Sequence, residues 1–166
     1  MSEYRIEPFA EQTRVDEQAI VELWTGERIL PLEEARRRVP EVLLVGTAEG
    51  SDEPVGISTV YLQRHPQLQL ELWHQRGFVT AEHRRTRLAT QMALGVRDLL
   101  RERWAAGDRR GAGIVMEVEH EGLKRDWPIA HWYWLDYLYV GDTPAGARIY
   151  VHYFPGAEAP LPQGTT

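Results

Sequence analysis

The residues best suited to chemistry lie in the stretch Gly77–Met92 (GFVTAEHRRTRLATQM). A strand pattern ends at Val79, a short loop follows, and a helical pattern opens near Arg87. The first N–H groups of a helix have no partner inside the helix, and the helix dipole favours negative charge beside them. Arg84 and Arg85 stand in the same loop and add positive charge. The combination predicts an anion-binding site, for which a pyrophosphate is the natural ligand.

The elements that position this loop are a strand before it and a long helix after it. Leucines alternate with polar residues over Leu68–Val79, which predicts a strand. The segment Thr86–Trp104 has an apolar face at helical spacing and contains no proline. Ile114–His120 has the pattern of another strand. A strand, a helix and a strand in this order imply one parallel crossover within a mixed sheet.

The flanking segments predict the rest of an α/β fold, with a mostly antiparallel central sheet, one parallel βαβ crossover and helices on its faces. Asp16 is a suitable cap for a helix that opens near Val15, and a second helix is expected between Leu32 and Pro40. Pro128 argues against one long helix over Glu121–Leu135. We expect a single domain over residues 1–154 and a flexible tail over residues 155–166. The other predicted strands are Tyr4–Phe9, Val42–Thr47, Val55–Arg64, Tyr137–Val140 and Arg148–Phe154.

The loop resembles the acetyl-CoA-binding motif of the GNAT superfamily of N-acetyltransferases. In that motif a strand ends in valine, a short loop follows, and Arg/Gln-x-x-Gly-x-Gly/Ala opens a helix. Val79 takes the valine position, and Arg84 and Ala89 fit the pattern, whereas Arg87 stands where the family has its first glycine. The resemblance implies that acetyl-CoA or coenzyme A is the co-substrate. It would be held by Val79, Arg84, Arg85, Thr86, Arg87, Leu88 and Ala89.

A second stretch, His131–Tyr137 (HWYWLDY), lies where the family has a helix that ends in aromatic-Tyr-x-x-Leu-Gly-Phe. Asp136 replaces the glycine of this pattern, and Trp132 stands where many members have the tyrosine that protonates the departing thiolate. Tyr133 is one residue away and is our candidate for that acid. The dense aromatic residues here form either core or the wall of a substrate pocket.

The resemblance also implies where a base would lie, because GNAT enzymes often place it on the strand that precedes the motif. Glu71 is our first candidate and His74 our second, and each competes with the interpretation of a solvated strand face. Trp73, His120 and Trp132 are expected to line the substrate pocket. The arginine groups Arg36–Arg38 and Arg109-Arg110 are interpreted as solvated faces.

Composition excludes several other chemistries. The chain has 166 residues and no cysteine, so disulfide scaffolds, thiolate metal sites and cysteine nucleophiles are excluded. Its six histidines are scattered without the spacing of metal ligands, so we expect no metal. Nineteen basic and 25 acidic residues give a net charge of −6, which disfavours general nucleic-acid binding. No apolar run is long enough for a transmembrane helix or a signal peptide, so a cytoplasmic protein is expected.

The sequence therefore predicts an acyltransferase that moves an acetyl or related group from coenzyme A to an amine of a small molecule or peptide. Two alternatives stay open. One is a catalytically inert GNAT-like domain that binds a ligand or a protein through its aromatic pocket. The other is a transferase of the same fold that uses a carrier-protein or tRNA-linked acyl donor. GNAT proteins are frequently dimers, so the resemblance also implies a homodimer.

Overall fold

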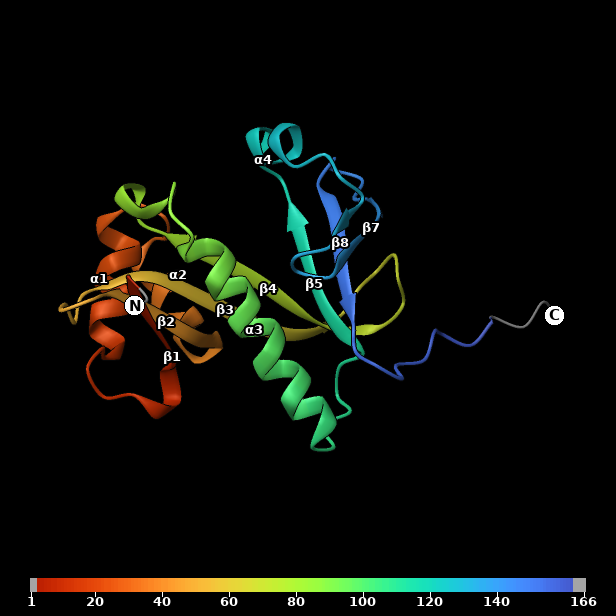
Figure 1. Ribbon diagram of the computed structural model, residues 1–166, viewed down its shortest axis with the longest axis horizontal. Coiled ribbons are helices and arrows are strands. Elements are labelled where there is room, and N and C mark those ends of the chain that lie inside the picture. The colour runs from red at the N-terminus through yellow and green to blue at the C-terminus, as the bar shows by residue number, and fades with distance from the viewer. Residues whose placement is uncertain (1–2, 163–166) are drawn as a thin grey trace. The chain divides into compact units, whose positions relative to one another are not determined.

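The computed structural model describes residues 3–162 (Figure 1). Strands and helices alternate along the chain much as the sequence pattern predicts. The strands are β1 (Tyr4–Pro8), β2 (Val42–Ala48), β3 (Pro54–Arg64), β4 (Glu71–Val79), β5 (Gly113–Val118), β6 (His131–Trp132), β7 (Tyr137–Asp142) and β8 (Arg148–Tyr153). The α-helices are α1 (Glu17–Gly26), α2 (Leu32–Arg38), α3 (Leu88–Ala105) and α4 (Glu121–Asp126).

The eight strands form one mixed sheet in the order β1-β2-β3-β4-β5-β8-β7-β6. β4 and β5 are parallel, with Trp73 opposite Ile114, and α3 is the connection between them. The pairs β1–β2, β2–β3, β5–β8, β6–β7 and β7–β8 are antiparallel. The predicted α/β class and the single parallel crossover are thereby confirmed.

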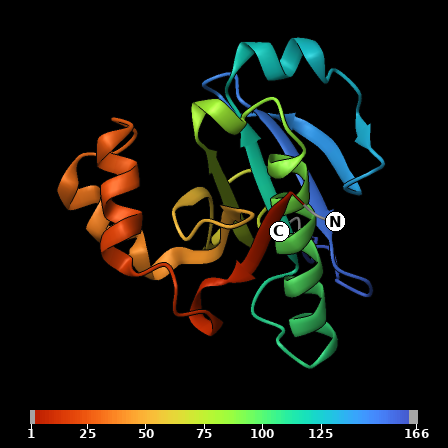
Figure 2. The same cartoon turned by 60° about the vertical axis from the view of Figure 1, so that its left-hand side comes forward.

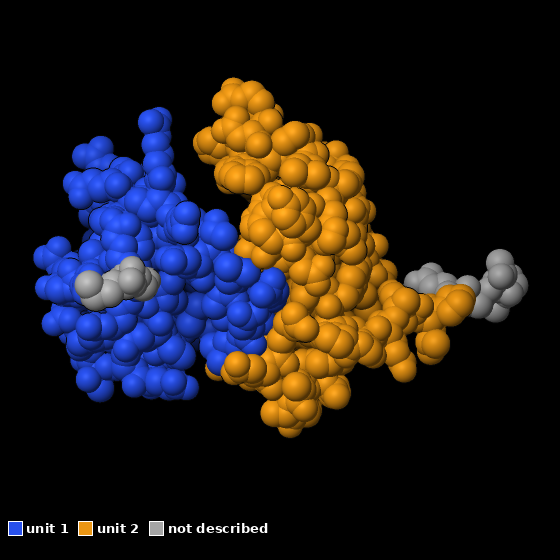
Figure 3. Space-filling view, in the orientation of Figure 1, with its two compact units in different colours: residues 1–60, 76–99 blue, residues 61–75, 100–166 orange. Residues whose placement is uncertain are grey.

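The contacts within the chain group it into two compact units (Figure 3). Unit 1 contains the described residues up to Val60 together with Arg76–Leu99. Unit 2 contains Tyr61–Gln75 and the described residues from Leu100 onward. The strands β3 and β4 and the helix α3 each contribute residues to both units.

In unit 1, α1 buries one face against the sheet. The helix begins where the sequence predicts, because the Asp16 carboxylate accepts a hydrogen bond from the backbone N–H of Ala19 (2.8 Å). Ile20 and Trp24 are almost fully buried and belong to the same core cluster as Ile57 of β3. The shorter α2 packs against α1 (Figure 2). The two helices therefore stand over the strands as one layer.

The first turns of α3 pack on β2 and β3 through two strand glycines. A Cβ atom at Gly56 would lie 2.5 Å from Met92 Sδ, and one at Gly46 would lie 3.2 Å from Leu88 Cδ1. Glycine at these positions lets the helix approach the strands closely. This packing fixes the start of α3, and hence the loop that precedes it.

Unit 2 is built around the centre of β8. Val151 of β8 pairs with Val115 of β5 and with Leu138 of β7. Val115 and Val151 are almost fully buried in one core cluster with Leu72. Lys124 of α4 donates from Nζ to Gly146 O (2.7 Å), which ties the helix to the turn before β8.

One segment differs from the sequence-based prediction, and the structure resolves another that the sequence left ambiguous. The strand β4 begins at Glu71 and not at Leu68, because residues 66–68 form a turn and Gln69 has a left-handed backbone (φ +57°). His65 stabilises this turn by accepting at Nδ1 from the N–H groups of Gln67 and Leu68 (both 3.3 Å). The ambiguous segment Glu121–Leu135 resolves into α4 and the two-residue strand β6. Within residues 3–162, no helix is both long and apolar enough to cross a membrane.

Candidate functional site

The loop between β4 and α3 is built by short local hydrogen bonds in unit 1. A single 3₁₀ turn, Ala81–His83, follows β4, and α3 begins at Leu88. Thr86 Oγ1 donates to His83 O (2.6 Å) and accepts from Leu88 N (3.2 Å). This hydroxyl therefore caps α3, which leaves the other N–H groups of its first turn available to a ligand.

Three exposed arginines surround this helix start. Arg84 turns back on the strand and donates from Nε to the carbonyl of Val79 (3.1 Å). Arg85 and Arg87 are exposed, and no ion pair holds either of them among the described residues. The seven residues predicted to hold a cofactor thus lie between the last residue of β4 and the first turn of α3, at the positive end of that helix.

Two buried oxygens beside the loop lack a partner among the described residues. They are Thr80 Oγ1, directly after β4, and Gln91 Oε1, in the first turn of α3. A buried polar atom without a partner is costly to the fold. The phosphates of coenzyme A suit the three exposed arginines and the free N–H groups at the start of α3, so the residues present fit that group.

The predicted bases lie on the part of β4 that belongs to unit 2, and their surroundings differ. Glu71 is exposed and lines an open groove of about 560 Å³ together with Arg64, Arg109 and Glu158. His74 is 9% exposed, and its ring is stacked between those of Tyr61 (4.9 Å) and His65 (5.8 Å).

His65 itself is fully buried and has a defined tautomer. Since its Nδ1 accepts two backbone N–H groups, the ring proton lies on Nε2. That nitrogen then donates to Glu117 Oε1 at 3.2 Å. No sequence motif surrounds this histidine, and its signal is the tight turn after β3.

The predicted pocket residues Trp73 and His120 lie in unit 2, where each contacts neighbouring residues in a way that stabilises the fold. The indole ring of Trp73 lies 5.1 Å from the guanidinium carbon of Arg110. The imidazole of His120 caps α4, where Nδ1 accepts from the N–H groups of Gly122 (3.1 Å) and Leu123 (3.4 Å). This cap accounts for a histidine at that position without a catalytic role.

The aromatic stretch does not form the helix that the resemblance implied. Trp132 belongs to β6, and the following residues make a turn into β7. Trp132 is buried and stacked on Tyr150, with ring centroids 3.9 Å apart. Tyr133 is 73% exposed and meets the ring of Trp134 edge-on. Tyr133 therefore lies on an open surface, while Trp132 is part of the packing of unit 2.

A small cavity in unit 1, which the sequence did not reveal, lies between the first two helices and the strands. It has a volume of about 100 Å³. Its wall is mostly apolar, with Arg38, Thr59 and Arg76 as its polar members; the others are Trp24, Ile29, Leu30, Ile57, Gly77 and Phe78.

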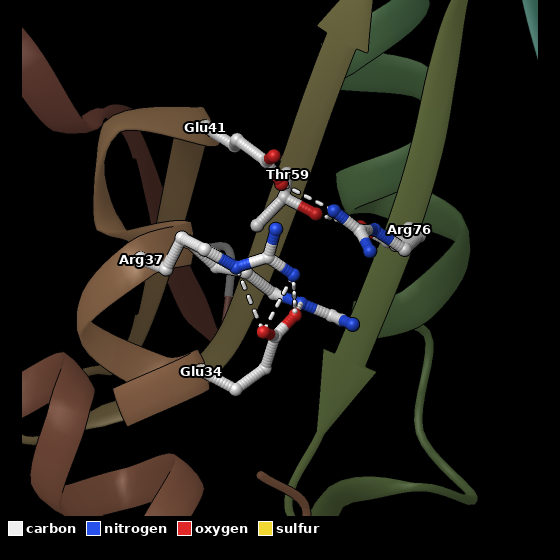
Figure 4. A network of polar contacts seen from close by, with 6 residues as sticks. Glu34, Arg37, Glu41, Thr59 and Arg76 are labelled. Atoms are coloured by element: carbon white, nitrogen blue, oxygen red, sulfur yellow. Dashed lines mark hydrogen bonds and ion pairs between the residues drawn. The ribbon is translucent and has the colours of Figure 1, made fainter. Parts of the chain in front are cut away.

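The arginines of the cavity belong to a network of ion pairs (Figure 4). Glu34 accepts from both Arg37 and Arg38, and Arg76 pairs with Glu41. Because both arginines donate to it, the pKa of the Glu34 carboxyl lies below its ordinary value. Within residues 3–162, no group of three or more His, Asp or Glu side chains is arranged to hold a metal ion.

No protein-family model matches the sequence, and no curated protein sequence matches it. Among solved structures, the chain is similar to a ribosomal-protein-S5-alanine acetyltransferase from Vibrio fischeri (11% identity, TM-score 0.61, 95% of this chain and 97% of that chain). It is also similar to an acetyltransferase of the GNAT family from Streptococcus pneumoniae (9% identity, TM-score 0.56, 92% and 100%). The chain has the GNAT fold.

A further structure with this fold is an aminoglycoside acetyltransferase in complex with coenzyme A and kanamycin. It shares 12% identity with this chain at a TM-score of 0.58, over 90% of this chain and 94% of that chain. Identities this low establish the shared fold and leave the activity to be argued from the site.

The backbone conformation explains one of the three positions that depart from the motifs. Asp136, which replaces a glycine, has φ +58°, a left-handed conformation that glycine adopts freely and aspartate tolerates better than most residues. Arg87 has no such conformation; its carbonyl accepts from Gln91 N (2.9 Å) as the first residue of an ordinary helix start. An arginine at this position therefore causes no backbone strain.

Proposed function

We propose that this protein transfers an acyl group, most simply acetyl, from coenzyme A to an amine. The observation that carries the proposal is the loop Val79–Ala89, which ends a central strand and opens α3 with three arginines beside unpaired helix amides. The GNAT fold supports it, because the solved structures that share the fold include acetyltransferases, one of them in complex with coenzyme A.

When bound, acetyl-CoA supplies a thioester whose carbonyl carbon is open to attack by a nucleophile. The amine nitrogen forms a C–N bond with that carbon, the C–S bond breaks, and the amine loses one proton while the thiolate gains one. Arg84, Arg85 and Arg87 would bind phosphate oxygens. The N–H group of Ala89 would donate to them as well, and Leu88, whose own N–H is held by Thr86 Oγ1, would place the first turn of α3 so that the helix dipole faces them. The resemblance of the sequence motifs assigns the amine proton to Glu71 or His74, which the variants below test, and the proton of the thiolate to Tyr133.

Binding of the donor is tested by thermal unfolding of the full chain with and without acetyl-CoA. A ligand at about 100 times its Kd stabilises by about 2.7 kcal/mol, which is several degrees for a chain of this length. Arg84→Ala and Arg87→Ala should lose most of this stabilisation. Arg5→Ala, an exposed arginine on β1, is the matched control and should keep it.

Turnover is tested with a thiol reagent that detects coenzyme A release as amines are added. Release that depends on an amine and is lost in Glu71→Gln or His74→Ala supports transfer and separates the two candidate bases. Binding without turnover favours the inert GNAT-like domain instead. Absence of any stabilisation by acyl-CoAs would contradict the proposal and favour a carrier-linked donor. A homodimer and a cytoplasmic location are further expectations, the first to be measured by light scattering.

A further inference from the structure

The cavity in unit 1 adjoins the predicted donor loop along the chain. Gly77 and Phe78 form part of its wall, and the next residue, Val79, ends β4 and opens that loop. The opposite wall comes from the end of α1 and the residues after it, Ile29 and Leu30. A compound bound here therefore lies beside the residues from which the donor loop begins.

The interior of the cavity is suited to an aliphatic group. Ile57 and Trp24 are 1% and 3% exposed, so this wall is dry and closely packed. The volume, about 100 Å³, is smaller than the roughly 150 Å³ of engineered apolar cavities that bind benzene. A branched chain of about four carbons fits such a space better than an aromatic ring.

The polar end of the cavity is positive, and Arg38 is the part of it that remains open to a ligand. Its Nε donates to Glu34 Oε1 (2.6 Å), and no partner is found for its two terminal amino groups within residues 3–162. The side chain is 26% exposed, so its charge is partly desolvated. A guanidinium oriented through Nε presents its remaining N–H groups as a pair, which matches the two oxygens of a carboxylate.

The acidic residues nearby do not compete for a cationic ligand. Glu34 binds both Arg37 and Arg38, and Glu41 binds Arg76 (Figure 4). The network thus contains three arginines and two glutamates, and no acidic residue lines the cavity. A polyamine, which has no carboxylate to pair with Arg38, would meet only positive charge here.

We propose that this cavity binds the acyl acceptor, and that the acceptor is a small amine with a branched aliphatic group and a carboxylate. The aliphatic group fills the apolar interior, and the carboxylate binds the terminal amino groups of Arg38. The assignment of the acceptor rests on the proposed acyl transfer, whereas the binding site itself does not. The transfer forms a C–N bond at the amine nitrogen as the C–S bond of the thioester breaks, and it leaves the carboxylate unchanged.

The binding site is tested without catalysis by calorimetric titration of the full chain with 4-methylpentanoate, which has the branched chain and the carboxylate but no amine. Binding should weaken at least tenfold in Arg38→Ala, because a charged hydrogen-bonded pair is lost. Arg36→Ala is the matched control: Arg36 is exposed on the same helix, does not line the cavity, and its loss should leave the affinity unchanged. 4-Methylpentanamide should bind at least tenfold more weakly than the acid. Equal binding of acid and amide, or an Arg38→Ala variant that binds like wild type, would overturn the site.

The acceptor assignment is tested by turnover with acetyl-CoA. L-Leucine should be acetylated with a KM at least tenfold below that of 3-methylbutylamine, which has the same branched chain and lacks the carboxylate. Arg38→Ala should remove this difference. In Ile29→Trp, whose substitution at the exposed rim of the cavity is expected to fold, leucine should be lost as a substrate while acetyl-CoA still stabilises the protein.

The outcomes separate this inference from the proposed function. Binding of 4-methylpentanoate that depends on Arg38, without acetyl-CoA turnover, supports the binding site and contradicts the acyl transfer. Turnover of simple amines without a preference for the carboxylate supports the transfer and overturns the acceptor assignment. If Ile29→Trp leaves leucine unaffected but excludes longer acyl-CoAs, the cavity holds the acyl group of the donor and the inference is wrong.

Discussion

Replacement of Gly113 by alanine should destabilise the sheet of unit 2 through a backbone clash. Gly113 is the first residue of β5 and pairs with Tyr153 of β8. A Cβ atom built on it lies 2.3 Å from His152 O and 3.0 Å from Tyr153 Cα. These are main-chain atoms of the neighbouring strand, so no side-chain rotation can relieve the contact.

The size of the effect follows from the displacement required. Ordinary contact begins near 3.4 Å, so the strands must separate locally by 3.4 − 2.3 = 1.1 Å. That is a large fraction of the roughly 4.8 Å spacing between paired strands and weakens about two hydrogen bonds, each worth about 1 kcal/mol. Overpacking strain adds about 1–3 kcal/mol to the loss of stability. Alanine also lowers the conformational entropy of the unfolded chain, which offsets about 0.4–1 kcal/mol of that loss. The expected net loss is about 2–4 kcal/mol.

Thermal unfolding followed by circular dichroism measures this loss. At about 2–4 °C per kcal/mol, the melting temperature of Gly113→Ala should fall by about 4–16 °C. Gly77→Ala in β4 is the matched control, because no atom lies within 4 Å of its added Cβ, and its melting temperature should stay the same or rise slightly. Equal melting temperatures for the two variants would refute the clash and the register of β5 against β8.

Three further predictions concern local stability. Asp16→Ala should lower the unfolding free energy by about 1 kcal/mol in urea titration, whereas Asp16→Ser, which retains a capping oxygen, should cost less. Asp136→Ala should be about 1 kcal/mol less stable than Asp136→Gly, because φ is +58° there; equal urea midpoints would contradict this conformation. Hydrogen bonds from Arg110 lower the pKa of Asp108 from 3.8 to about 2, so this carboxylate stabilises the fold above about pH 4 and loses that effect as the pH falls toward 2. Asp108→Asn should therefore be less stable than wild type by at most about 1 kcal/mol at pH 6, since the pair lies at the surface, and equally stable at pH 2.

Much of the fold could be predicted because its signals are local. Asp16 lies directly before an apolar helical pattern and caps α1, and the strand–helix–strand order around α3 predicts the parallel β4–β5 pair. The segment before β7 could not be predicted in this way. Its short strand exists because His131 and Trp132 pair with Leu138 and Tyr137, and such pairing is not visible in a sequence window.

In the candidate site, too, the parts with local sequence signals could be predicted and the parts formed by distant segments could not. The donor loop was predicted because its arginines and its helix start are adjacent in sequence. Arg38 was missed, since Arg36–Arg38 has the composition of a solvated helix end, where cations favour the dipole. What distinguishes Arg38 is the cavity beside it and the carboxylate of Glu34 on its Nε, and the cavity is formed by segments distant in the chain.

Lys124 is the single lysine of the chain, and its contacts have a practical consequence for labelling and for enzyme assays. Its amine donates to Glu121 Oε1 and Gly146 O, and the side chain is 14% exposed. Amine-reactive dyes, cross-linkers and coupling surfaces therefore find little to modify among the side chains. For the same reason, self-acylation of lysine would contribute little background in an amine screen, so thiol release can be attributed to the added acceptor.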